Sequence, residues 1–404
     1  MLPVGEASQK QTFPFKLPKQ TPKFLVLLAA GCLTTMTGGV VSPVLPEMVQ
    51  QLHLDPKWAG MLVSMHALTI ALFTPVFGIL ADRVGKLKVM IPSLLLYSLF
   101  GTLGAFIPHL VPLLVVRGLL GAASGGVAAA SIGLLGTMYD GEVRSRVLGY
   151  ATSAMTTAAI MVPIIGGWIG SEHWQHAFYL YTLGVPLAIV AAFVLNDKPS
   201  QKASAIAPSA QREQLFRCLR QPQTLQLYAI LALAATVVYA VVIYTPLYLK
   251  ATIGAGPELN GIVLGVRAIG AAIISAVGAS WLAKRIGVKQ TIALGFFLMS
   301  LTLITIPFLH QIELILPTAV LFGIGFGIIT PNTYNALANR APAEVRASVL
   351  AIGTGANSLG QFISPLILGS VWKYMGLPTV FFVTAGIAIS MSIASLTQRE
   401  SALD

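Results

Sequence analysis

Three ionisable side chains, His66, Arg117 and Arg267, stand inside long apolar stretches of this 404-residue chain. Each lies about six to eight residues into its stretch, a depth of about 9–12 Å if the stretches are membrane-spanning helices. A charged group at that depth is costly and usually faces a cavity or a partner. A guanidinium binds a carboxylate in a bidentate geometry, and an imidazole exchanges protons near neutral pH. The three residues therefore predict binding of an anion, transfer of a proton, or both.

The acidic residues lie elsewhere. All 14 of them fall outside the apolar stretches or at their ends, and Glu47, just beyond Pro46, comes closest to the interior. Without a buried carboxylate the two arginines leave positive charge that an anionic group could compensate, which argues against a cationic substrate. Structural alternatives stay open: Arg117 could bind helix carbonyls, Arg267 could extend to the membrane surface, and His66 could be a packing residue.

A second group of candidates consists of polar side chains within the apolar stretches. Such residues often only join helices, so each is a weaker candidate for substrate contact. The group comprises Thr34, Thr35, Tyr239, Tyr244, Asn332, Asn335, Asn357 and Gln361.

The elements that position these residues follow from composition. The chain is 55% hydrophobic and 10% charged, with a mean hydropathy of +0.80. That is too apolar for a water-soluble fold, and stretches of about 20 apolar residues span a bilayer as helices. No alternating strands suggest a barrel. We expect twelve spans, at roughly 23–45, 58–80, 89–107, 111–138, 147–170, 176–195, 223–249, 259–282, 290–309, 312–338, 346–371 and 378–396.

Several chemistries have no sequence signature here. We find no nucleotide fingerprint, nucleophile elbow or metal-ligand cluster, so we expect neither an enzyme nor a bound metal or cofactor. Cys32 and Cys218 do not form a disulfide framework. The 25 basic residues give a net charge of +11, but most of them fall in loops on one side of the expected membrane. This bias predicts an inner-membrane protein with both termini in the cytoplasm, and argues against nucleic-acid binding.

A linker and an internal repeat divide the chain. The polar stretch 196–221 separates six spans from six, and a shift of 202 residues aligns ADRVGK at 81–86 with AKRIGV at 283–288 and EVRSRVL at 142–148 with EVRASVL at 344–350. Halves with six spans each have the same orientation, so they form parallel repeats around a central cavity. The expected organisation is a cytoplasmic tail, a six-helix bundle, a cytoplasmic linker, a second six-helix bundle and a cytoplasmic tail, at 1–22, 23–195, 196–221, 222–396 and 397–404.

Three motifs carry a family resemblance. GILADRVGKLKVM at 78–90 is similar to the signature loop between helices 2 and 3 of the major facilitator superfamily. SPVLPEM at 42–48 and RGLLG at 117–121 resemble motifs of its drug:proton antiporter branch. The helix 5 motif of that branch is partly present: Ala158 and Val162 replace glycines. The loop matches at Gly78, Leu80, Asp82, Arg83, Gly85, Lys86 and Lys88, and helix 5 matches at Gly149, Pro163, Gly166 and Gly167.

The resemblance implies roles for these residues. It makes the loop a latch, in which Asp82 faces the start of helix 11, near Glu344 to Arg346, and holds the cytoplasmic side shut. Gly85 permits the tight reversal. Independently of the resemblance, the basic residues Arg83, Lys86 and Lys88 fix the orientation of the chain in the membrane and could pair with acids such as Asp140 or Glu142, and a turn that serves topology alone is the alternative. Lys284 stands where the second half should repeat the acid, so we expect a one-sided latch. The resemblance also gives Arg117 a part in proton coupling.

The leading interpretation is a monomeric, alternating-access transporter that exports a small organic molecule in exchange for protons. His66 or an acid near a membrane surface would then titrate. The alternative is an organic-anion exchanger or uptake carrier that uses Arg117 and Arg267. A membrane sensor without transport activity ranks lower, because the tails and linker are too short for a soluble sensor domain. The bilayer, the substrate and protons are the only partners expected.

Overall fold

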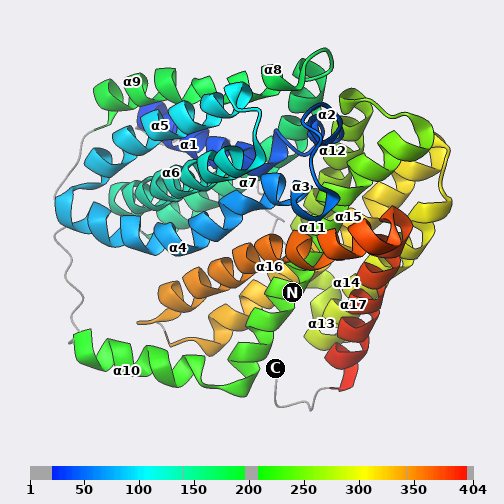
Figure 1. Cartoon of the computed structure of the whole chain (residues 1–404). Helices are drawn as coiled ribbons and strands as arrows, with labels where there is room; N and C mark the ends of the chain where they lie inside the picture. The colour runs from blue at the N-terminus through cyan, green and yellow to red at the C-terminus, as the bar shows by residue number, and fades with distance from the viewer. Residues whose placement is uncertain (1–20, 140, 196–207, 343, 398–404) are drawn as a thin grey trace, which may run out of the picture.

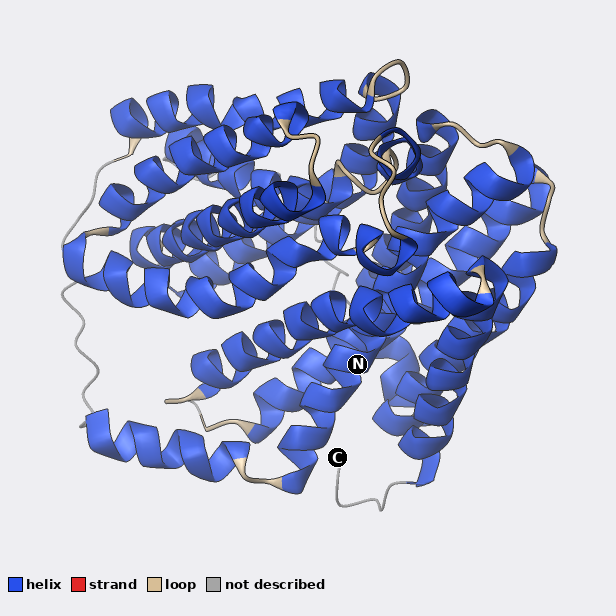
Figure 2. Cartoon of the chain, in the orientation of Figure 1, coloured by secondary structure: helices blue, strands red, loops and turns tan. Residues whose placement is uncertain are grey.

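The computed structural model describes residues 21–139, 141–195, 208–342 and 344–397, and all regular secondary structure within them is helical (Figure 2). The prediction of an all-helical membrane protein is confirmed. The linker contains a helix, α10 (Pro208–Leu219), which the sequence did not predict. It precedes the spans of the second half. The remaining linker residues, 196–207, and most of the two tails lie outside the described residues.

The first half of the chain builds one bundle (Figure 1). Its helices are packed around α6, which contacts α4, α5 and α1, while α1 also packs against α7. The elements are α1 (Thr21–Gly39), α2 (Leu45–Gln51), α3 (Pro56–Ala59), α4 (Met61–Val84), α5 (Lys86–Leu103), η1 (Gly104–Phe106), α6 (Leu110–Met138), α7 (Gly141–Ile169), α8 (Trp174–Phe178), η2 (Tyr179–Leu183) and α9 (Gly184–Val194).

The second half builds a similar bundle. Here α11 packs against α16, α12 against α15, and α14 against α15 and α17. The elements are α11 (Pro222–Ile253), α12 (Pro257–Ile273), η3 (Ile274–Gly278), α13 (Ala279–Ile286), α14 (Val288–Thr305), η4 (Ile306–Phe308), α15 (Ile312–Arg340), α16 (Arg346–Met375) and α17 (Leu377–Thr397).

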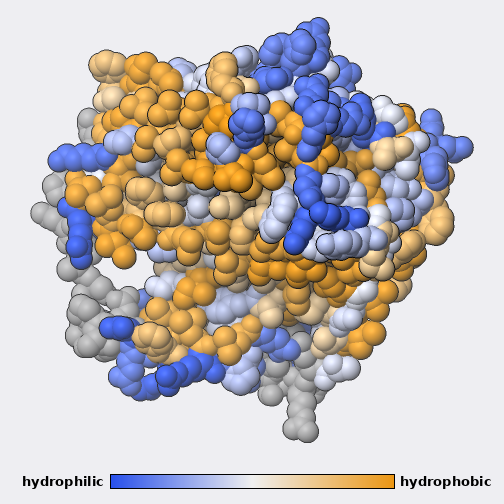
Figure 3. Space-filling view, viewed as in Figure 1, coloured by the Kyte–Doolittle hydropathy of each residue, from blue (hydrophilic) through white to orange (hydrophobic). Residues whose placement is uncertain are grey.

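Ten helical spans among the described residues are long and apolar enough to cross a membrane. Helices α1 and α16 fall short of that measure, and α16 carries polar residues such as Asn357 and Gln361 along its length. With α1 and α16 included, the arrangement is consistent with the twelve expected spans. Apolar side chains cover much of the outer surface of the bundles, while hydrophilic residues gather around α2, α3 and α8 and around α10 (Figure 3).

The internal repeat extends to the helix ends. A shift of 202 residues places both ends of α5 on those of α14, both ends of α6 on those of α15, and η1 on η4. The glycines that follow α4 and α13, Gly85 and Gly287, have φ values of 109° and 91°. Since only glycine adopts this region at little cost, both halves use the same turn to reverse the chain.

Among the described residues, the extensive contacts between the two bundles lie towards one end of the molecule. We call this the outer end; it bears α2 and α3, and the opposite, inner end bears α10. Cross-bundle contacts join α7 to α12, α4 to α16, α3 to α16 and α2 to α11. At the inner end α4 and α16 diverge, and a notch opens between the bundles on the side of α10 (Figures 1 and 3). The structure is therefore open at its inner end.

Candidate functional site

A cavity of about 230 Å³ lies between the two bundles. Helices α1 and α7 supply its wall from the first half, and α11, α12, α15 and α16 supply the wall from the second half. Its lining is mixed, with an apolar surface interrupted by a few polar groups. The lining residues are Thr35, Gly38, Gly39, Ser42, Ala159, Pro163, Ala235, Val238, Tyr239, Val242, Leu264, Arg267, Phe326, Asn357 and Gln361.

Arg267 supplies a positive charge to the cavity wall from α12. Its Nε is buried without a hydrogen-bond partner. The same side chain borders a second, much smaller space of about 20 Å³ inside the second bundle, where the other surrounding residues are apolar apart from Thr245 and Thr318. No acidic residue lines either space among the residues that the structure describes. The guanidinium is therefore placed to receive an anionic group.

Arg117 has the opposite surroundings. It is 1% exposed, and its guanidinium makes three hydrogen bonds. Nε donates to the Leu62 carbonyl at 2.8 Å, Nη1 to the Tyr181 hydroxyl at 3.1 Å, and Nη2 to the Thr37 carbonyl at 2.5 Å. These contacts tie α6 to α4, to η2 and to the end of α1. Arg117 is thus a satisfied structural cation behind the cavity wall rather than part of it.

His66 lies beside the cavity wall and not in it. The side chain is buried on α4, and a Cβ added at Gly38 would lie 2.9 Å from His66 Cε1 and 3.1 Å from the Tyr239 hydroxyl. Gly38 thus lets the imidazole and the phenol approach the same point of α1. Tyr239 and Arg267 line the same cavity. His66, Tyr239 and Arg267 thus form a cluster of ionisable side chains between the bundles.

Two amide side chains line the cavity from α16. Gln361 Nε2 donates a hydrogen bond to Asn357 Oδ1 at 2.8 Å, which leaves the Asn357 amino group directed elsewhere. Thr35, also in the lining, donates its hydroxyl to the Cys32 carbonyl at 2.7 Å. The sequence candidates Tyr239, Asn357, Gln361 and Thr35 are therefore brought together around one cavity with Arg267.

The other polar candidates do not line this cavity. Asn332 is buried and donates to the carbonyls of Ala279 at 3.1 Å and Ile328 at 2.8 Å, so it joins α15 to α13. The Tyr244 ring packs edge-on against Trp372, with centroids 5.9 Å apart. Asn335 is exposed on α15. Thr34 donates to the Gly31 carbonyl within its own helix.

Glycines allow a close contact between the bundles where α7 crosses α12. A Cβ at Gly167 would lie 2.2 Å from the Pro257 carbonyl oxygen, and one at Gly261 would lie 2.4 Å from that of Pro163. Gly166 faces the backbone of Val40 inside the first bundle, at 3.1 Å by the same measure. The helix 5 motif residues Pro163, Gly166 and Gly167 thus form a backbone-to-backbone contact surface at the outer end.

Two ion pairs also link the bundles at the outer end. Lys250 Nζ lies 3.1 Å from Glu47 Oε1, and Lys373 Nζ lies 2.7 Å from Asp55 Oδ2. Glu47 and Asp55 belong to the first half and the lysines to the second. Lys250 is therefore the ion-pair partner of Glu47.

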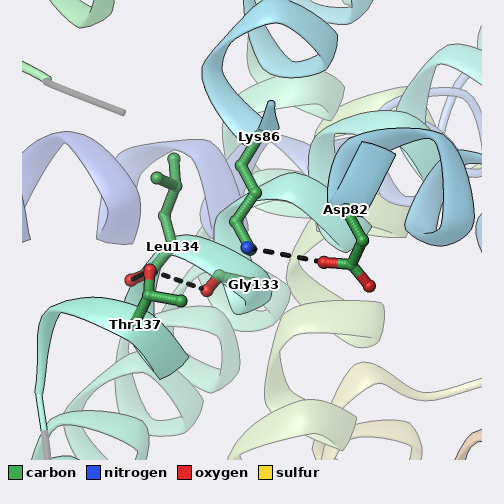
Figure 4. Close-up of polar contacts among 5 residues, drawn as sticks. All are labelled: Asp82, Lys86, Gly133, Leu134 and Thr137. Carbon is green, nitrogen blue, oxygen red and sulfur yellow. Dashed lines mark hydrogen bonds and ion pairs between the residues drawn. The ribbon is translucent and has the colours of Figure 1, made fainter. Parts of the chain in front are cut away.

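The signature loop lies at the inner end, between α4 and α5 (Figure 4). Lys86 is largely buried against α6, where a Cβ at Gly133 would meet its Cε at 2.8 Å, and its Nζ lies 3.4 Å from Asp82 Oδ1. The Asp82 side chain is 71% exposed, so here it pairs within its own loop. Asp140 lies outside the described residues, and so does the Glu142 side chain. A Cβ added at Gly78 would have no neighbouring atom within 4 Å, and Arg83 is exposed.

Sequence reasoning missed several residues that shape the site. Ser42 donates to the Val242 carbonyl and Asn260 to the Pro43 carbonyl at 3.3 Å, and both bonds cross between the bundles. Lys250 and Lys373 carried a signal, because they are two of only three basic residues in the expected outer loops. Gly261 and Phe326 carried none. Within the described part of the chain, no cluster of three or more His, Cys, Asp or Glu could hold a metal.

Comparisons with known proteins agree with this architecture. The family model described as Major Facilitator Superfamily matches residues 27–266 and 227–402. The chain is 25% identical to the multidrug resistance protein MdtG of Klebsiella pneumoniae (strain 342), over 90% of each protein. It is 24% identical to the quinolone resistance protein NorA of Staphylococcus aureus (strain MSSA476), over 90% of this chain and 92% of NorA. It is also 24% identical to the cis,cis-muconate transport protein of Acinetobacter baylyi, over 86% and 85%.

Solved structures share the fold at lower sequence identity. The nucleoside transporter NupG matches with a TM-score of 0.78 and 13% identity, over 93% of this chain and all 100% of that one. A bacterial homologue of the lysosomal transporter Spinster, in an inward-facing and occupied conformation, matches with a TM-score of 0.79 and 14% identity, over 96% and 99%.

Proposed function

The chain belongs to the Major Facilitator Superfamily, and on that premise we propose that this multi-pass membrane transporter exports a small organic molecule in exchange for protons. One observation carries the proposal: the two bundles that enclose the cavity are in contact at the outer end, while α4 and α16 diverge at the inner end and leave a notch there. A carrier in that state takes up its substrate from the inner side. Parallel six-helix halves then rock about the cavity to expose it on the other side.

The relatives support export. MdtG is a multidrug resistance protein and NorA a quinolone resistance protein, and both align with this chain along almost their whole length. The muconate transport protein, which aligns over a similar share of its length, supports the view that a carboxylate substrate fits the same scaffold. The names of these relatives support export by this chain. The substrate class is instead argued from the residues that line the cavity.

Proton coupling is assigned to His66. No acid lines the cavity among the described residues, so the imidazole is the titratable group nearest to it whose usual pKa is near neutral pH. His66 approaches the point of α1 at Gly38 that the Tyr239 hydroxyl also approaches, and both Gly38 and Tyr239 line the cavity. A change in its charge would therefore act on the wall of the substrate site. Arg117 donates a hydrogen bond to the Leu62 carbonyl and so supports the backbone of α4, the helix that carries His66.

The signature loop closes the inner end in this proposal. Asp82 is exposed here, and α16 begins at Arg346 with no helix yet packed over Gly78. When the inner end closes, the start of α16 approaches Gly78 and Asp82, and the carboxylate faces the positive end of the helix. Replacing Asp82 by Asn would then weaken inner closure and raise labelling of the cavity from the inner side. Unchanged labelling and unchanged transport would contradict the latch.

The membrane orientation follows the charge bias of the loops. We place the inner end and both termini in the cytoplasm of a cell with an inner or plasma membrane, because most basic residues lie in the loops on that side. The chain acts as a monomer in this proposal, since each bundle supplies part of the cavity and one chain supplies both bundles.

Proteoliposomes test the proposed activity. Purified protein with an imposed pH gradient should drive net movement of norfloxacin, and His66→Gln should remove the pH dependence while leaving exchange at equal pH. Trp281→Phe, an exposed change on α13, serves as the control. Movement that does not respond to the pH gradient would contradict proton coupling, and absence of any flux would contradict the transport of this probe.

A further inference from the structure

We propose that the cavity binds an organic anion, and that Arg267 holds the carboxylate of that anion. The inference rests on the proposed function, because it names the chemical class of the molecule that passes through the cavity. Of the two arginines inside the spans, it assigns the ligand to Arg267 and excludes Arg117.

Arg267 is the arginine whose surroundings need a ligand. Its Nε is buried without a hydrogen-bond partner, and neither of the two spaces that it borders is lined by an acid among the described residues. A buried cation without a counter-charge is expensive, and a carboxylate that binds the planar guanidinium in a bidentate geometry relieves that cost. By contrast, Arg117 already makes three hydrogen bonds and does not line the cavity.

The charged side chains in and directly behind the cavity wall are positive. Arg117 lies behind the wall and Arg267 lies in it, and a guanidinium is a positively charged group. The acids at the outer end, Glu47 and Asp55, already pair with lysines. Among the described residues, a cation in the cavity would therefore meet one positive charge in the wall, a second behind it and no carboxylate, while an anion would be attracted.

The other lining groups fit the remainder of such a molecule. Phe326, Leu264 and Val238 offer an apolar surface, and the Asn357 amino group and the Tyr239 hydroxyl are available as donors to further oxygens. The preferred ligand is thus a carboxylate attached to an apolar body, with the charge at α12 and the body against α11 and α15.

Three probes of the same shape test the charge preference. Naphthalene-2-carboxylate, 2-naphthamide and 2-naphthylmethylamine share one apolar body and differ in charge. Calorimetric titration of the purified protein at pH 7 should show the carboxylate binding at least about tenfold more tightly than the amide, and the amine more weakly than the amide.

Substitutions at Arg267 should change the relative affinities of the three probes in a direction that follows from charge. Arg267→Gln should abolish the preference for the carboxylate and strengthen binding of the amine, because the repulsion is gone. Arg267→Lys should retain a reduced preference, since the charge remains without the fork of donors. Arg285→Gln, which removes an equal charge from the exposed end of α13, should change nothing. Thermal unfolding of each variant verifies that it is folded.

The proposal is overturned if the three probes bind equally, if none binds, or if the preference survives in Arg267→Gln. Flux measurements distinguish a failure of the anion site from a failure of the proposed function. Norfloxacin movement without a carboxylate preference would remove the anion site and keep the transporter. A carboxylate preference that depends on Arg267, in a protein that moves neither norfloxacin nor the naphthoate, would keep the site and remove the proposed export.

Discussion

Arg117 and Arg267 are the same residue type on apolar helices, and their neighbours give them different roles. Arg117 is enclosed by carbonyls from α4 and α1 and by the Tyr181 hydroxyl, which itself lies 3.2 Å from the Thr37 carbonyl. Arg267 borders two spaces and its Nε has no partner. A guanidinium with its donors used holds helices together, whereas one with free donors binds a ligand.

Arg117→Gln should therefore lower stability and Arg267→Gln should not. Loss of three hydrogen bonds from a buried charged group should cost about 2–4 kcal/mol, because the glutamine cannot reach all three acceptors. Thermal unfolding in detergent measures the difference between the two variants. Equal destabilisation by both would show that Arg267 also has a structural role.

The Asp55–Lys373 pair should not respond to pH in the range where the imidazole titrates. Hydrogen bonds from Lys373 and from the backbone N–H of Lys57 hold the pKa of Asp55 below its usual value of 3.8. Its contribution to outer closure is complete above that value and is lost only as the pH falls through the lowered pKa. Asp55→Asn should therefore leave the shape of the transport profile between about pH 5 and 8 unchanged. A shifted midpoint in that range would contradict this assignment.

The sequence located the ionisable residues but not their partners. Composition alone showed that His66, Arg117 and Arg267 lie inside spans, since a single charged residue is conspicuous in an apolar run. Which arginine faces a cavity depends on helix rotation and on residues far away in the chain, such as Tyr181 and Thr37. A single sequence holds no signal for such contacts.

Helices α7 and α12 pack closely at the outer end, because glycine lets their backbones touch. Small residues allow close approach of helices in lipid, where no hydrophobic force brings them together. Gly167 meets Pro257, and Gly261 meets Pro163 and Ile164. The contact has to open when the outer end opens, so these glycines stabilise the inner-open state alone.

Gly261→Ala should shift the protein toward the outer-open state. The added methyl would lie 2.4 Å from the Pro163 carbonyl oxygen, a backbone atom that cannot rotate away. Labelling of a cysteine introduced at Ser42 by an impermeant maleimide added from outside should rise several-fold. Gly386→Ala on α17, which has no neighbour within 4 Å, is the matched control. Unaltered labelling in Gly261→Ala would mean that α7 and α12 stay together in both states.

The element-level predictions succeeded where they rested on the repeat. The shift of 202 residues found in two loops also relates the ends of α5 to α14 and of α6 to α15. Short-range signals fixed these ends, above all Gly85 and Gly287 with their positive φ. Helix α10 was not predicted, because its segment contains Pro, Ser, Ala and charged residues, a composition that resembles that of an unstructured linker.

At the scale of the whole molecule, the outer end is held by charge as well as by packing. Two lysines of the second half, Lys250 and Lys373, pair with two acids of the first half. Basic residues are otherwise rare in the expected outer loops, so their use there is not explained by membrane topology. The pairs instead connect the halves in the state that is open inward.

Exchanging the charges of the Glu47–Lys250 pair tests this connection. Glu47→Lys should favour the outer-open state, because two ammonium groups then face each other in a partly buried site. Adding Lys250→Glu should restore the wild-type distribution, with a coupling of about 0.5–3 kcal/mol in a double-mutant cycle. A double variant that stays outer-open would show that the pair does not hold the halves together.

The global arrangement was predictable to the level of two bundles and a central cavity. An even number of spans per half and a repeat are enough to require parallel halves. The state of the molecule was not predictable, since one sequence encodes both the closed and the open forms of each end. Which end is closed emerges only from contacts such as those between α7 and α12.

Two distances measured together test alternating access most directly. With Cys32 and Cys218 replaced, spin labels at Lys88 and Ala347 report on the inner end, and labels at Gln50 and Tyr374 report on the outer end; all four positions are exposed. The account predicts that Gly261→Ala and Glu47→Lys lengthen the outer distance and shorten the inner one in the same fraction of molecules. An inner distance that stays unchanged while the outer one lengthens would contradict it.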